Sequence, residues 1–351
     1  MEDVLKKVNR VYLHVATHPI AFESRVDKVM TLLSIRSDDE VHIVGIYGMG
    51  GIGKTTIAKA VYNSICDGFD GSSFLSDIKD IFGQPNGLAS IQQQLLSDIL
   101  NLKIIRIHNV DRGINLIRER LCHRRVLIVL DDVDDSTQLN SLVGDLKWFG
   151  VGSRIIVTTR DERVLTELEV DERYKVEELN LEESLQLFSW HAFRTPNPKN
   201  GYFQLSKSVV DHVQGLPLAL EILGSHLFKR SQLEWESVVE KLRQIPHDQI
   251  QKKLRISFDT LDNQSKAIFL DIACFFIGMD KEYVMKILDG CGFFPVIGVS
   301  TLLERSLITI GQKDHKLKMH DLLQDMGREI VRELEPNHIG RRSRLDRKSV
   351  V

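Results

Sequence analysis

The sequence lacks the features that mark secreted, membrane-spanning and disulfide-stabilised proteins. Its 351 residues include only four cysteines, with no C-x-x-C pair, so neither a disulfide framework nor a zinc site is expected. No run of about 18 apolar residues occurs, and residues 1–10 alternate charged with apolar side chains where a signal peptide would have an apolar core. These absences predict a cytoplasmic or nucleo-cytoplasmic protein with reduced thiols and no membrane span.

An excess of charge of either sign is also missing. Lysine and arginine together number 46, against 49 aspartates and glutamates, which gives a formal net charge of −3. Such a balance provides no field that would concentrate the protein on nucleic acid or on anionic lipid. The length and the 42% hydrophobic content are sufficient for two or three folded domains.

The first half of the chain has the pattern of a parallel sheet. Between Val41 and Val176, short β-rich apolar runs alternate with longer helical patterns, which is typical of a sheet with helices on both faces. The run VLIVL at Val126–Leu130 is continuously apolar, as expected of a strand that is buried on both faces. The predicted strands are 41–47, 73–76, 126–130, 154–158 and 174–176.

The second half predicts helices and then a hairpin. Beyond about Leu179 the apolar residues follow a helical period, and 307–310 and 316–319 flank the turn GQKDH. Helices followed by a hairpin suggest a winged helix. The predicted division is an N-terminal linker at 1–21, a phosphate-binding subdomain at 22–177, a helical subdomain at 178–248, a winged-helix subdomain at 249–335 and a tail at 336–351.

One glycine-rich segment predicts the ligand. GMGGIGKTT, Gly48–Thr56, follows an apolar strand and opens a helical pattern, which is the context that a phosphate-binding loop requires. Glycines let backbone N–H groups close on phosphates, and the helix N-terminus adds a positive dipole. Lys54 would reach the β- and γ-phosphates, while the Thr55 hydroxyl would ligate Mg²⁺. The predicted nucleotide contacts in this loop are Gly48, Gly50, Gly51, Ile52, Gly53, Lys54, Thr55 and Thr56.

Charged residues follow two of the predicted strands, at the sheet edge where ligands bind in open α/β folds. Asp131 suits the Mg²⁺ shell together with Thr55, and Asp132 could polarise an attacking water. In IIVTTR, Arg160 would stabilise a γ-phosphate, so Asp132 and Arg160 are the predicted catalytic residues. The alternatives are solvated acids in a strand-end turn and a surface salt bridge for Arg160.

Six motifs stand in an order that resembles the NB-ARC domain of plant intracellular immune receptors. With the phosphate-binding loop they are VLIVLDDVD, GSRIIVTTR, GLPLAL at 215–220, FLDIACFF at 269–276 and MHD at 319–321. The resemblance covers about Phe22–Glu335 and implies an α/β P-loop NTPase with a five-stranded parallel sheet, followed by a helical and a winged-helix subdomain. Asp134, where the coiled-coil class usually has Trp, resembles the class with an N-terminal TIR domain.

The resemblance also implies nucleotide contacts from the later subdomains. Pro217 in GLPLAL would pack on the base or ribose, although the first position of a helix would explain this proline equally well. His320 in MHD would reach the β-phosphate of ADP, the alternative being a satisfied structural histidine. Asp321 would orient His320 or hold the turn as an N-cap. Ala21 replaces the usual glycine, which leaves the adenine contacts near residues 20–22 unassigned.

The function that the resemblance implies is an immune switch. ADP would keep the subdomains closed, ATP would favour an open, self-associating form, and hydrolysis would be at most slow resetting. The TIR domain and leucine-rich repeats of full-length relatives do not occur in this sequence, which predicts an excised core or a truncated member. Two alternatives are a P-loop kinase or motor ATPase, for which no acceptor-site motif is found, and a winged-helix nucleic-acid-binding regulator, whose recognition segment Val299–Leu307 carries only one Glu and one Arg.

Overall fold

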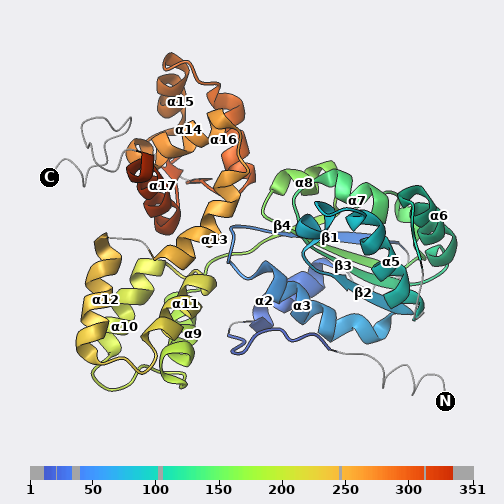
Figure 1. Ribbon diagram of the computed structural model, residues 1–351, viewed down its shortest axis with the longest axis horizontal. Helices are drawn as coiled ribbons and strands as arrows, with labels where there is room; N and C mark the ends of the chain where they lie inside the picture. Colours follow the sequence, from blue (N-terminus) through green and yellow to red (C-terminus); the bar gives the residue numbers. More distant parts are fainter. Residues whose placement is uncertain are drawn as a thin grey trace. The chain divides into compact units, whose positions relative to one another are not determined.

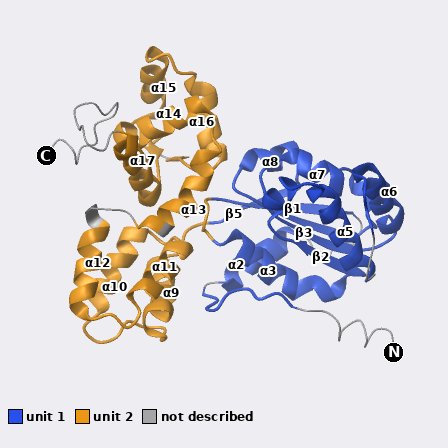
Figure 2. Ribbon diagram, in the orientation of Figure 1, with its two compact units in different colours: residues 1–48, 53–176 blue, residues 49–52, 177–351 orange. Residues whose placement is uncertain are grey.

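The computed structural model describes residues 12–20, 22–33, 40–101, 106–244, 247–311 and 314–334. The chain forms two compact units, the first made of residues 1–48 and 53–176 and the second of residues 49–52 and 177–351 (Figures 1 and 2). Residues 1–11 of the predicted linker, Ala21 and the predicted tail lie outside the described residues.

The first unit contains a five-stranded parallel sheet, as predicted, with the strand order β2-β3-β4-β1-β5. The predicted strand ends differ from the observed ones by at most three residues. β5 is the edge strand and is largely exposed, whereas the β3 and β4 side chains are almost all buried. The strands are β1 (His42–Tyr47), β2 (Gly71–Leu75), β3 (Val126–Val133), β4 (Arg154–Thr159) and β5 (Glu172–Lys175).

Helices cover both faces of this sheet. α3 (Lys54–Ile65) carries the chain from β1 out to β2, and the connections from β2 through β3 to β4 return in the opposite direction. Because parallel crossovers are right-handed, α3 lies on one face and the returning helices lie on the other (Figure 1). The returning helices are α4 (Ile78–Phe82), α5 (Gly87–Leu100), α6 (Val110–Leu121) and α7 (Ser136–Val143).

The aliphatic core fixes this layer arrangement. Side chains from the sheet and from the returning helices form one buried cluster, and its members with no exposed surface include Leu95, Ile117, Ile128, Leu139 and Ile155. α8 (Glu162–Glu167) leads from β4 to β5 on this face, whereas α3 leaves the carboxyl end of β1 for the opposite face. The chain therefore changes direction at the carboxyl end of β1, which is where open α/β sheets bind ligands.

The second unit begins with a layer of helices around one tryptophan. Trp235 is buried, stacks on Phe193 with ring centroids 5.2 Å apart, and donates its indole N–H to the Leu227 carbonyl at 3.1 Å. The helices are α9 (Leu181–Phe193), α10 (Phe203–Val213), α11 (Pro217–Leu227) and α12 (Gln232–Gln244).

The rest of the second unit confirms the predicted helices and hairpin. β6 (Thr309–Ile310) pairs antiparallel with β7 (Leu317–Lys318), and both strands are shorter than predicted. α17 (Asp321–Leu334) follows directly. The preceding elements are α13 (Asp248–Asp259), α14 (Asn263–Asp271), the π-helical turn η3 (Ile272–Phe276), α15 (Lys281–Gly290) and α16 (Pro295–Glu304).

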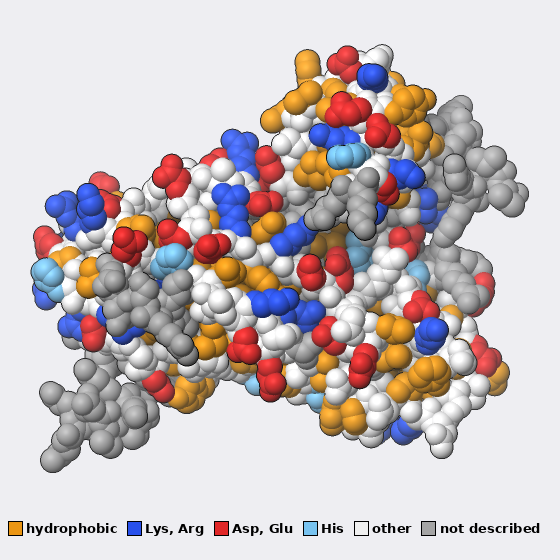
Figure 3. Space-filling view, turned by 180° about the vertical axis from the view of Figure 1, so that it is seen from behind, with side chains coloured by type: hydrophobic (Ala, Val, Ile, Leu, Met, Phe, Trp, Pro, Cys, Tyr) orange, Lys and Arg blue, Asp and Glu red, His pale blue; other side chains and the backbone are white. Residues whose placement is uncertain are grey.

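The surface agrees with the balanced composition. Acidic and basic side chains are interspersed over the face that Figure 3 shows. Within the described part of the chain, no helix combines the length and the hydropathy that crossing a membrane would require.

Candidate phosphate-binding site

The loop between β1 and α3 has the backbone of an anion-binding turn. Gly48, Gly51 and Gly53 adopt φ angles of 146°, 80° and 100°, a region that residues with side chains rarely adopt. Gly53 is the N-cap of α3, and no described side chain caps this helix. The first N–H groups of α3 therefore remain available to an anion at the positive end of the helix dipole.

Gly51 is also required by close packing, because residues 49–52 belong to the second unit. A Cβ at Gly51 would lie 2.8 Å from the Leu218 Cβ, and the Leu218 N–H donates to the Gly51 carbonyl at 3.2 Å. Leu218 follows Pro217, which is the first residue of α11, so the helix-start explanation of this proline is confirmed. Its contact with a nucleotide stays a prediction.

Lys54 is buried where the loop enters α3. Its side chain is 6% exposed, and Nζ donates to the Gly48 carbonyl at 2.9 Å. The pKa of Lys54 is lowered to about 7, first by burial and then by the Arg160 charge, while Asp132 and Asp131 oppose the shift. A cation whose charged form is disfavoured in this way would gain from an anion placed beside it, which a phosphate would provide.

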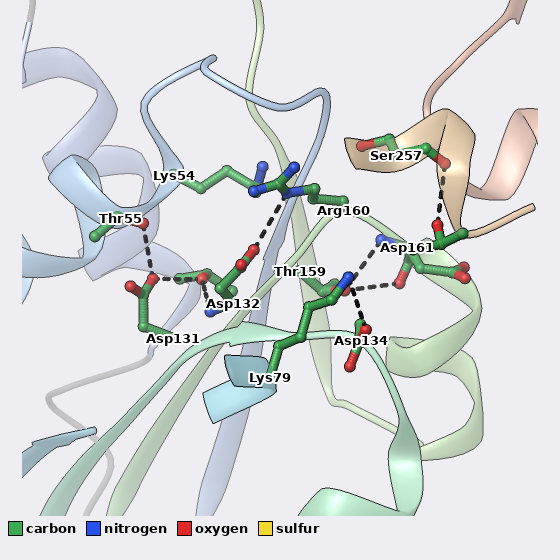
Figure 4. A network of polar contacts seen from close by, with 12 residues as sticks. Lys54, Thr55, Lys79, Asp131, Asp132, Asp134, Thr159, Arg160, Asp161 and Ser257 are labelled. Carbon is green, nitrogen blue, oxygen red and sulfur yellow. Dashed lines mark hydrogen bonds and ion pairs between the residues drawn. The ribbon is translucent and has the colours of Figure 1, made fainter. Parts of the chain in front are cut away.

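Asp131 lies at the carboxyl end of β3 and is 2% exposed. The Thr55 hydroxyl donates to its Oδ1 at 2.9 Å (Figure 4). Burial raises the pKa of Asp131, although hydrogen bonds from Thr158 and Thr55 oppose this. One carboxylate and one hydroxyl are the oxygen ligands with which Mg²⁺ binds beside phosphate and water oxygens. The described residues contain no group of three or more His, Cys, Asp or Glu that could hold a metal by itself.

The two predicted catalytic residues contact each other. Arg160 Nε lies 3.2 Å from Asp132 Oδ1, and each side chain is 28% exposed (Figure 4). The salt bridge that was the alternative for Arg160 is therefore observed. It lies inside the site, because both of its members are close enough to Lys54 to shift the pKa of that residue. Arg160 Nη1 is buried without a hydrogen-bond partner among the described residues. A phosphate oxygen would satisfy it.

Sequence reasoning missed two contributors to this edge of the sheet. Thr158 hydrogen-bonds to Asp131 and to the Asp132 backbone. Lys79 forms an ion pair with Asp134 at 2.9 Å (Figure 4). The sequence signal for Thr158 is a hydroxyl side chain at the end of a predicted strand, two residues before Arg160. Lys79 gave no signal, because its partner lies 55 residues away in the sequence.

In the second unit, the MHD segment differs from expectation. α17 begins at Asp321, and the residue that caps it is His320, whose Nδ1 accepts the Leu322 N–H at 3.2 Å. The predicted N-cap role of Asp321 is therefore wrong. Asp321 Oδ2 accepts a hydrogen bond from Gln214 Nε2 at 2.7 Å instead, and no hydrogen bond joins it to His320 among the described residues. The reason is that the chain becomes helical one residue earlier than a cap at Asp321 would require.

Burial disfavours the charged form of the histidine in this segment. Burial lowers the pKa of His320, while the Glu178 carboxylate opposes the shift. Because Nδ1 accepts a hydrogen bond, the proton of the neutral ring lies on Nε2. Nε2 is buried and makes no hydrogen bond of full geometry among the described residues, although the nearby Gln214 backbone favours the charged form of the ring. His320 thus presents an unused N–H donor, while its contact with ADP stays a prediction.

Comparison with protein families gives two matches. The model of the NB-ARC domain matches residues 22–197, and that of the Roq1-like winged-helix domain of disease resistance proteins matches residues 262–335. The disease resistance protein RUN1 of Vitis rotundifolia is 43% identical over 98% of this chain, which spans 26% of that protein. The TMV resistance protein N of Nicotiana glutinosa is 38% identical over 98% of this chain, which spans 30% of it. The chain therefore covers about a quarter to a third of the length of these relatives.

Solved structures agree on the fold. The Walker-type ATPase of Pyrococcus abyssi has a TM-score of 0.54 at 12% identity, covering 88% of this chain and 96% of that one. The ORC2 protein of Aeropyrum pernix, solved with ADPNP and ADP, has a TM-score of 0.53 at 14% identity, covering 92% of this chain and 97% of that one. At such low identity the likeness shows a P-loop NTPase fold and nothing finer.

The buried cation generates a prediction about stability. Lys54→Met is expected to raise the free energy of unfolding of the nucleotide-free protein by about 1–4 kcal/mol near pH 7, because it removes a desolvated charge. The pKa of Lys54 is about 7 in the folded protein and 10.5 ordinarily, so the unfolded chain binds more protons between these pH values and wild-type stability rises across that window. The gain should therefore shrink as the pH rises. Urea unfolding of both proteins over this pH range checks it, and a less stable variant near pH 7 would contradict it.

Proposed function

Because the chain belongs to the NB-ARC family of plant disease resistance proteins, we propose that it is a nucleotide-dependent switch, closed with ADP and open with ATP. One observation carries the proposal: the buried cation Lys54, the uncapped start of α3 and the Thr55–Asp131 pair meet at the carboxyl edge of the sheet. This arrangement suits a phosphate chain with a divalent cation.

The first unit supplies the phosphate contacts of this switch. The N–H groups of Gly48–Thr56 bind phosphate oxygens, and Lys54 turns from the Gly48 carbonyl toward the β- and γ-phosphates. Thr55 and Asp131 hold Mg²⁺, directly or through its water shell. When bound, Mg²⁺ neutralises charge on the phosphates. Arg160 has one partner, Asp132, and one unused buried nitrogen, so it can receive a γ-phosphate that ADP lacks.

Hydrolysis in this scheme resets the switch slowly. Asp132 is placed to orient an attacking water, but its carboxylate is engaged by Arg160. A γ-phosphate oxygen competes with Asp132 for the same guanidinium. Binding of the γ-phosphate to Arg160 therefore releases the Asp132 carboxylate to activate water. Recognition of ATP by Arg160 is in this way coupled to hydrolysis by Asp132.

The second unit supplies the closed-state contact. Gln214, which ends α10 with a φ of 47°, joins the GLPLAL segment to the MHD segment through its bond to Asp321. The unused Nε2–H of His320 donates to the β-phosphate of ADP, and Pro217 contacts the base or ribose. A hydrogen bond to a charged group contributes about 1.5–3 kcal/mol, and only a contact that differs between the two states can bias them.

The output of the switch belongs to the longer protein. In a full-length relative with TIR and leucine-rich-repeat domains, the open form self-associates and signals a defence response in the cytoplasm or nucleus. In this proposal, opening separates three subdomains, which are residues 22–177, 178–248 and 249–335.

The nucleotide assignment is tested with Lys54→Ala. Losing the buried cation is expected to weaken ADP and ATP binding more than about a hundredfold, since truncating one member of a buried charge pair costs 2–5 kcal/mol or more. Equilibrium binding of labelled nucleotides measures it. Lys59→Ala, on the same helix but beside the Phe74 ring, is the matched control and should bind normally. Unchanged affinity in Lys54→Ala would show that the site lies elsewhere.

The water-activating role is tested with Asp132→Asn, because asparagine tolerates the φ of 55° found there. Single-turnover ATP hydrolysis is expected to fall by about 10²- to 10⁴-fold while ATP affinity changes little. Asp134→Asn, which removes only the Lys79 ion pair, should leave hydrolysis near the wild-type rate. Equal losses of binding and hydrolysis in Asp132→Asn would make Asp132 a structural or metal residue.

The clamp is tested with Asp321→Val. Losing the Gln214 bond is expected to cost the closed form about 1.4 kcal/mol, which shifts the populations about tenfold toward the open form. ADP should dissociate faster, and the radius in small-angle scattering should increase. Gln214→Asn, which is too short for the bond but tolerates the φ of 47°, should behave in the same way, while Asp321→Asn keeps an acceptor and serves as the control. If ADP release and dimensions stay unchanged in both Asp321→Val and Gln214→Asn, the clamp does not exist.

A further inference from the structure

The two acids of the site lie in an irregularity of the sheet. β3 and β4 pair regularly up to Leu130 and Val157, and their next pair is Val133 with Thr159. Two residues of β3, Asp131 and Asp132, therefore face one residue of β4, Thr158. This is a β-bulge, which interrupts the ladder and redirects side chains, and bulges of this kind occur often beside active sites.

A single hydroxyl takes the place of the interrupted ladder. Thr158 Oγ1 donates to Asp131 Oδ1 at 2.6 Å and accepts the Asp132 N–H at 2.9 Å. A hydroxyl has one hydrogen to donate, so its donor is fully used on Asp131. Thr158 is 1% exposed, so water does not compete for these bonds.

The bond to the backbone holds Asp132 in an unfavourable conformation. Asp132 has a φ of 55°, in the left-handed region that costs energy for a residue with a side chain. The Thr158 bond offsets this cost by satisfying the Asp132 N–H at the bulge. In this conformation the Asp132 carboxylate reaches Arg160, which directly follows β4.

The bond to the side chain fixes the other acid. Asp131 Oδ1 accepts hydrogen bonds from two hydroxyl groups, that of Thr158 on β4 and that of Thr55 on α3. Its second oxygen, Oδ2, accepts no hydrogen bond from the residues that the structure describes. The carboxylate is thereby held with one oxygen engaged and one oxygen left for a ligand.

We infer that Thr158 is a positioning residue for the Mg²⁺-dependent function of the site, in that its hydroxyl aims Asp131 at the cation and holds Asp132 at the γ-phosphate. This inference rests on the proposed nucleotide function and adds a residue that touches neither nucleotide nor metal. Thr158 acts through the two acids, and its effect on nucleotide affinity is therefore confined to states that contain Mg²⁺.

Three variants distinguish the effect of the Thr158 hydroxyl from the effects of side-chain shape and of a change elsewhere in the strand. Thr158→Val keeps the shape and removes the hydroxyl, and Thr158→Ser keeps the hydroxyl. Thr159→Val is the matched control on the same buried strand, because the Thr159 hydroxyl bonds only to the Asp161 backbone. Each 351-residue chain is titrated with a non-hydrolysable ATP analogue over a range of Mg²⁺ concentrations and also in EDTA.

Thr158→Val is expected to need about tenfold more Mg²⁺ for half-maximal tightening of analogue binding, as the loss of one hydrogen bond to a charged group predicts. Binding in EDTA should stay close to wild type, while the thermal midpoint of Thr158→Val should fall because the buried Asp132 N–H loses its partner. Thr158→Ser and Thr159→Val should show the wild-type Mg²⁺ requirement. Should Thr158→Val fail to fold, Thr158→Ala takes its place in the same titration.

Two results overturn the inference. One is a wild-type Mg²⁺ requirement in the hydroxyl-free variant, and the other is an equal loss of affinity with and without Mg²⁺, which would assign the hydroxyl to the fold alone. A wild-type chain that binds no nucleotide, with or without Mg²⁺, would instead overturn the proposed function.

Discussion

The positive N-terminus of α3 is the constraint on which the rest of the site depends. An uncapped helix start, a buried lysine and an arginine with an unused nitrogen converge there. Burying positive charge is costly unless an anion accompanies it, and the lowered pKa of Lys54 expresses that cost. The sheet edge, the glycine conformations and the placement of the acids all serve to bring a phosphate chain to this point.

Charged side chains around this helix start are paired with one another or with hydroxyl groups. Asp132 engages Arg160, Asp131 engages the Thr55 hydroxyl, and Thr158 joins the two acids across a β-bulge. In the second unit the same principle applies to His320, whose neutral ring keeps one N–H unused.

The parts that the sequence predicted are those encoded by neighbouring residues. The phosphate-binding loop, the buried β3 run and Asp131 after it follow from local pattern, because a strand, a glycine turn and a helix start are set by consecutive side chains. The strand ends were less accurate, since β3 continues through the acids to Val133.

What the sequence did not predict depends on pairing between distant segments. The role of Thr158 follows from a bulge that exists only once β3 and β4 are in register, and the bond between Gln214 and Asp321 joins residues that are 107 positions apart. The error over the α17 cap arose because aspartate is a preferred N-cap residue and histidine is not, and only the observed backbone places the cap at His320.

The central claim is that the closed protein is held by ADP, and the nucleotide that copurifies with it tests this most directly. Denaturing the purified chain and separating the released nucleotides by ion-exchange chromatography identifies and quantifies the ligand. The account predicts a near-stoichiometric amount of ADP from the wild-type chain and none from Lys54→Ala. Wild-type protein that carries no nucleotide and takes up none when ADP is added would contradict it.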